Sequence, residues 1–71
     1  MTDREWMEAL SARLGVEPPT ADEHDAILRL AGVAAHASQR TAAPSTAWMA
    51  ARSGRPLAEV LEAAEALASQ G

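Results

Sequence analysis

The chain has 71 residues and no cysteine, and its ten acidic residues against six basic ones give a net charge of −4. This length supports one domain, residues 1–71, near the lower limit for a single hydrophobic core, and the lack of cysteine excludes disulfides and thiolate metal sites. The acidic balance argues against sequence-independent nucleic-acid binding. No apolar run approaches about 18 residues, and the N-terminus is charged from Asp3. We therefore expect no spanning helix, no signal peptide and a cytoplasmic protein.

Residues 2–14 are predicted to form the first helix of an all-α protein. Thr2 and Glu5 have the spacing of a capping box, in which each side chain satisfies the other residue's free backbone amide. Gly15 follows as a left-handed stop. The apolar residues that share one side of this helix are Trp6, Met7, Leu10 and Leu14.

The second predicted helix, residues 22–40, is the longest and the most apolar. Pro18 and Pro19 form a rigid connector before it, and Thr20 with Glu23 repeats the capping-box spacing. At about 100° per residue, its apolar side chains spread over roughly 220°, more than the stripe of a surface helix. We therefore expect this helix to be central, with neighbours on several sides.

Two shorter helices follow, over residues 44–53 and 56–69. Pro44 is suited to the first helical position, Gly54 ends the third helix, and Pro56 starts the fourth almost at once. The apolar side of the fourth helix comprises Leu57, Val60, Leu61, Ala64, Leu67 and Ala68. The predicted fold is a compact four-helix bundle with a long central second helix.

One polar strip interrupts the apolar surface of the second helix, and it contains Asp25, Arg29, Gly32, His36 and Arg40. Glycine permits close approach of a ligand or another backbone, and the arginines present planar donor groups that suit carboxylate or phosphate. Two alternatives stay open: His36 is an ordinary surface histidine, or His36 or Arg40 caps carbonyl groups at the helix end.

A helix-turn-helix spacing occurs in residues 50–60, where Gly54 follows Ala50 by four positions and Val60 follows six later. This pattern would make the fourth helix the DNA-recognition helix of a helix-turn-helix motif. The same spacing arises wherever two short helices cross at a tight glycine turn. Because that helix exposes Glu59, Glu62 and Glu65, which would repel phosphates, packing explains the pattern better.

Catalytic and metal sites find little support in the sequence. His24 and His36 lie far apart and have no second histidine or cysteine at ligand spacing. The serines have no placed base, and no glycine-rich phosphate loop is present. We therefore expect no enzyme, no metal and no cofactor.

Residues 27–54 resemble the central part of a small helical bacterial family of unknown function, and with the last helix the similarity extends over nearly the whole chain. The matching positions are Leu28, Leu30, Ala31, Ala35, His36, Arg40, Ala43 and Pro44, together with Trp6 and Gly54. Members occur as free short proteins, or beside or fused to molybdenum cofactor guanylyltransferases, which attach GMP to molybdopterin. Arg29 and Gly32 depart from the usual family pattern. The resemblance implies a role near molybdenum cofactor maturation, and it implies no reaction.

The sequence and this resemblance together favour a non-catalytic accessory module that binds a protein, either the guanylyltransferase or a molybdoenzyme. The candidate binding residues are Arg29, Gly32, His36, Arg40 and Trp48. An alternative is direct binding of an anionic pterin or nucleotide by the arginines and the histidine. A homodimer would also cover surface that so small a core leaves exposed.

Overall fold

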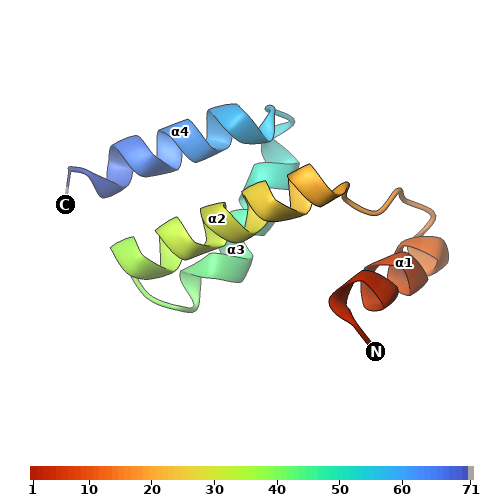
Figure 1. The fold of residues 1–71 in the computed structure, drawn as a ribbon. Coiled ribbons are helices and arrows are strands. Elements are labelled where there is room, and N and C mark those ends of the chain that lie inside the picture. Colours follow the sequence, from red (N-terminus) through yellow and green to blue (C-terminus); the bar gives the residue numbers. More distant parts are fainter. Residues whose placement is uncertain (71) are drawn as a thin grey trace.

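The structure, a computed structural model, describes residues 1–70, which form four α-helices and no strand (Figure 1). The helices are α1 (Asp3–Leu14), α2 (Ala21–Ala37), α3 (Ala42–Ser53) and α4 (Leu57–Ala68). The predicted all-α fold, with four helices, bundle-like packing and a long central second helix, is confirmed. Within the described residues, no helix has the length and apolar character needed to cross a membrane.

Both predicted capping boxes are present. The amide of Glu5 donates to the Thr2 hydroxyl at 3.1 Å, and the Thr2 amide donates to the Glu5 carboxylate at 2.8 Å. Thr20 and Glu23 repeat this geometry at 3.1 and 2.8 Å. Each box satisfies amide groups that the first helical turn leaves free, so it fixes where α1 and α2 begin.

The second helix ends at Ala37 and not at residue 40 as predicted. The Ser38 hydroxyl donates to the Ala34 carbonyl at 2.8 Å, and the Ser38 backbone leaves the helical region. This side-chain bond competes with continuation of the helix. The prediction that Arg40 lies on α2 with His36 is therefore wrong, because Arg40 lies in the turn that leads to α3.

The two glycines predicted as helix stops have left-handed backbones, with φ of 71° at Gly15 and 69° at Gly54. Only glycine adopts this conformation without a steric penalty. The third helix begins at Ala42, so the prediction that Pro44 is its first residue is wrong. Pro44 still lies in the first turn, where a missing amide donor removes no intrahelical hydrogen bond.

Helix α2 packs against both α3 and α4. Along the chain, α3 runs back beside α2 and α4 then runs in the same direction as α2 (Figure 1). Leu30 of α2 is the most buried side chain, at 1% exposed, and Ala50 of α3 is also buried. The core is thus small and is centred on the middle of α2.

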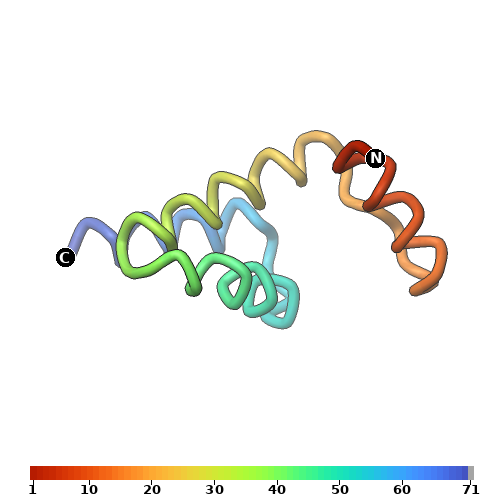
Figure 2. The backbone as a smooth tube through the Cα atoms, turned by 90° about the horizontal axis from the view of Figure 1, so that it is seen from below, coloured from red at the N-terminus to blue at the C-terminus, as the bar shows by residue number. Residues whose placement is uncertain are grey.

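Helix α1 lies beyond the N-terminal end of α2 and packs along none of the other three helices (Figures 1 and 2). The Arg4 guanidinium donates to the Pro19 carbonyl at 2.6 Å, and Asp3 lies 3.3 Å from the His24 imidazole. These polar contacts tie α1 to the connector and to the start of α2. The neighbours of α2 are therefore α3 and α4, fewer than the wide apolar arc of α2 suggested.

Candidate functional site

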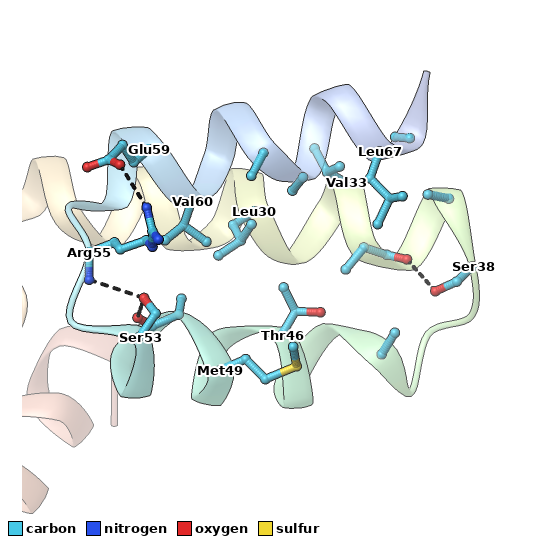
Figure 3. Close-up of a pocket in the computed structure, with 17 residues that line it drawn as sticks. Leu30, Val33, Ser38, Thr46, Met49, Ser53, Arg55, Glu59, Val60 and Leu67 are labelled. Carbon is cyan, nitrogen blue, oxygen red and sulfur yellow. Dashed lines mark hydrogen bonds and ion pairs between the residues drawn. The ribbon is translucent and has the colours of Figure 1, made fainter. Parts of the chain in front are cut away.

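An apolar groove lies between α3 and α4, with α2 as its floor (Figure 3). Its volume is about 560 Å³. We call it the α3–α4 groove and define it by its principal lining residues, Leu30, Val33, Thr46, Met49, Val60 and Leu67. It lies within the size range of ligand-binding pockets in proteins.

The local sequence explains why the groove forms. On α2, Leu30, Val33, Ala34 and Ala37 recur at the three- and four-residue spacing that places them on one face. Several of the wall positions on α4 are alanine, and their short side chains leave the space unfilled. Because α3 and α4 pack against α2 and not against each other, that face of α2 stays open between them.

Polar groups lie at the ends of the groove and are already paired (Figure 3). At one end, Arg55 lies 3.2 Å from the Glu59 carboxylate, and the Ser53 hydroxyl accepts from the Arg55 amide at 3.1 Å. At the other end, Ser38 donates to the carbonyl of Ala34. The middle of the groove presents mainly hydrocarbon and sulfur, with the Thr46 hydroxyl as a polar group among them (Figure 3). It therefore suits apolar side chains better than a charged ligand.

The walls of the groove carry large apolar side chains that face water. Met49 of α3 is 64% exposed and Leu67 of α4 is 69% exposed. Single exposed apolar residues are common on proteins, but contiguous apolar patches mark interaction surfaces. Here both side chains border the same groove from opposite walls, so one partner in the groove would contact both.

In the structure, the predicted polar strip on α2 is exposed to solvent. Arg29 lies 3.1 Å from the Glu65 carboxylate of α4, and both side chains are largely exposed. His36 is exposed near the C-terminal end of α2. A methyl group added at Gly32 would meet no atom within 4 Å, so open space lies beside this glycine. The strip is a solvated side of α2 and forms no enclosed pocket.

The remaining predicted site residues lie elsewhere. Arg40 is exposed in the turn after α2. Trp48 is exposed on α3, and the Arg52 guanidinium lies 4.9 Å from the centre of its ring, a cation–π arrangement. Trp48 is two residues before the buried Ala50, so it lies about 200° around α3 from the core. The structure therefore does not gather the five predicted residues into one site.

Sequence reasoning missed the α3 wall of the groove. Thr46, Met49 and Ser53 recur at three- and four-residue spacing, which was the available signal for a shared face. Leu67 was assigned correctly to the apolar side of its helix, and its exposure was not foreseen. Periodicity identifies an apolar side, but it does not tell whether a neighbour covers it.

The acidic side chains bear on two local features, metal binding and helix capping. Within residues 1–70, no three histidine, aspartate or glutamate side chains lie close enough together to hold a metal ion. The Thr2 backbone amide, assisted by the Thr2 hydroxyl, holds the pKa of Glu5 below its ordinary value of 4.5. This shift belongs to the helix cap and explains the local structure of α1.

The comparisons with known proteins give a family but no activity. No curated protein and no solved structure significantly matches this sequence. The family model described as a domain of unknown function, DUF6457, matches residues 2–71. A family of unknown function is what the resemblance of residues 27–54 implied. Because the match covers almost the entire sequence, the chain belongs to the DUF6457 family.

Proposed function

We propose that this protein is a non-catalytic interaction module and that its α3–α4 groove binds the apolar face of an amphipathic helix from a partner protein. The observation that supports this proposal is the open apolar groove, with Met49 and Leu67 exposed along its walls. Helix-in-groove binding is a recurrent mode of peptide recognition, in which apolar anchors enter such a groove at helical spacing.

The dimensions of the groove suit a helix of about three turns. Helices α3 and α4 have 12 residues each, and a helix of this length extends about 18 Å. A ligand helix of similar length would present anchors at positions i, i+3 or i+4, and i+7. Complete burial of a fully exposed side chain of this size contributes about 1.5–3 kcal/mol. Met49 and Leu67 are 64% and 69% exposed, so covering each of them contributes most of that amount.

The proposed partner is a molybdenum cofactor guanylyltransferase, or a molybdoenzyme that receives the cofactor. This part of the proposal rests on the resemblance of residues 27–54 to proteins found beside or fused to that enzyme. The module would then act in cofactor maturation as an accessory that docks on the enzyme. The polar groups at the ends of the groove, with the exposed Arg55–Glu59 pair at one of them, would fix the direction of the bound helix.

A calorimetric titration of purified guanylyltransferase with the wild-type chain and two variants tests this proposal. Met49→Glu places a charge in the groove, whereas His36→Ala alters the polar strip on α2. We expect wild-type binding that Met49→Glu weakens at least tenfold and that His36→Ala leaves unchanged. Absence of binding, or binding that depends on His36 and not on Met49, would contradict the groove as the docking site.

The two alternatives from the sequence have less structural support. Capture of an anionic pterin or nucleotide would require Arg29, which is already paired with Glu65, and Arg40, which lies in a separate turn. A helix-turn-helix DNA-binding protein would have to place α4 against DNA phosphates. That helix exposes Glu59 and Glu62, and their charge opposes such contact.

A further inference from the structure

Helix α1 has an apolar side that its own chain covers only in part. Trp6 is 58% exposed, Leu10 is 39% exposed and Leu14 is 64% exposed. These residues recur every four positions and therefore lie along one side of the helix. The structure thus contains an amphipathic helix with a largely exposed apolar side, in addition to the open α3–α4 groove.

The total accessible surface indicates how much more area the chain exposes than a compact monomer of the same mass. The surface is 5571 Å² for a chain of 7.4 kDa. A compact monomer of this mass would expose about 4,200 Å², so the excess is about 1,400 Å². Stable protein–protein interfaces bury about 800 Å² per partner, and obligate dimers bury more than about 1,000 Å². The excess is therefore of the size that an obligate dimer covers on each chain.

The length of α1 suits the α3–α4 groove. Helix α1 has 12 residues, as do α3 and α4, which form the groove walls. A fourth helix laid between α3 and α4 would complete the bundle around the exposed face of α2. Trp6, Leu10 and Leu14 would then contact the residues that the groove leaves exposed, chiefly Met49 and Leu67.

We propose that two copies of this chain exchange α1, so that α1 of each copy occupies the α3–α4 groove of the other. In each copy, the bonds from Arg4 to Pro19 and from Asp3 to His24 hold α1 away from its own groove. The connector through Pro18 and Pro19 is stiff, because proline fixes its backbone angle. Exchange between two copies preserves these contacts, and a two-fold axis closes the assembly with two equal interfaces.

This inference goes beyond the proposed function, and the two can fail separately. Self-association is measured on the purified chain alone, whereas partner binding requires the guanylyltransferase. If both hold, the partner helix competes with α1 for the same groove. Binding of the guanylyltransferase would then become tighter when α1 carries a charge that weakens exchange.

Sedimentation equilibrium over a wide concentration range tests the exchange. We expect the wild-type chain to reach twice its mass of 7.4 kDa. Leu10→Glu in α1 and Leu67→Glu in the groove should each raise the dissociation constant at least about 100-fold, because each change affects both equal interfaces. Leu28→Glu is the matched control, since Leu28 is similarly exposed but lies on α2 away from the groove. Circular dichroism verifies that the variants keep their helices.

Mixing the two variants distinguishes exchange from other dimers. The Leu67→Glu chain has an intact α1 and the Leu10→Glu chain has an intact groove, so an equal mixture should dimerise more tightly than either variant alone. A monomeric wild type, an equal loss from Leu28→Glu, or a mixture no tighter than its components would overturn the proposal. As a check independent of these charges, Leu10→Cys and Leu67→Cys chains, otherwise free of cysteine, should form a mixed disulfide; its absence would likewise overturn exchange.

Discussion

Truncating Leu30 to alanine should destabilise the protein more than any comparable change on α2. Leu30 is 1% exposed and lines two grooves together with residues of α3 and α4. It lines the α3–α4 groove and also a second apolar cavity of about 320 Å³ near Ile27 and Leu57. Removing its side chain therefore takes contacts from both sides of the small core at once.

The size of the effect follows from burial. A buried leucine truncated to alanine costs about 2–5 kcal/mol. The site opens toward two grooves, so we expect about 3 kcal/mol for Leu30→Ala. A domain of 71 residues has a total stability of about 4–11 kcal/mol. The variant should thus lose roughly a third or more of its stability, and its melting temperature should fall by about 12–24 °C.

Urea denaturation followed by circular dichroism measures this loss. The control is Leu28→Ala, two residues earlier on the same helix, where the side chain is 57% exposed. We expect this control to cost less than about 1 kcal/mol, because little apolar surface leaves the core. If Leu28→Ala costs as much as Leu30→Ala, the placement of the core on that face of α2 is wrong.

Three further predictions concern caps, acid and glycines. Thr20→Ala should lower the free energy of unfolding by about 1 kcal/mol, whereas Thr2→Ala should only fray α1 and leave the main transition unchanged; equal effects on urea denaturation would contradict the separateness of α1. Because the pKa of Glu5 is depressed in the fold, its contribution to α1 is present above pH 4.5 and is lost as pH falls through the lower folded value. NMR titration should give a Glu5 pKa below 4.5, which Thr2→Ala raises only in part because the backbone amide stays; a wild-type pKa at or above 4.5 would contradict the cap. Gly32→Ala should stabilise the protein by about 0.5–1 kcal/mol and Gly54→Ala should destabilise it by about 1 kcal/mol; thermal unfolding checks the opposite signs, and two shifts in the same direction would refute the argument.

The sequence was sufficient to predict the features that depend on local chemistry. Thr2 and Thr20 cap their helices, and Gly15 and Gly54 end theirs, because each interaction lies within a few residues along the chain. The end of α2 was not predicted, although it also involves a local hydrogen bond. The Ser38 hydroxyl has several local acceptors available, and its choice of the Ala34 carbonyl depends on the backbone that the following turn imposes.

The groove and the isolation of α1 could not be predicted in this way. Helical periodicity showed that Trp6 and Leu10 share a side, but whether another helix covers that side depends on the path of the connector. The surroundings of the polar strip on α2 could not be predicted either, because Glu65, the partner of Arg29, lies on another helix. Such pairings depend on how α4 crosses α2, which the residue pattern of either helix alone does not specify.

The most direct test of the central claim is the solvent exposure of the Met49 methyl group, measured by NMR with a soluble paramagnetic agent. The Met1 methyl, on an exposed terminal residue, serves as the internal reference. If a helix covers the α3–α4 groove, relaxation at Met49 should fall well below that at Met1 as the chain associates or binds the guanylyltransferase. Equal relaxation at Met49 and Met1 at every concentration, with and without the enzyme, would contradict the groove as a docking surface.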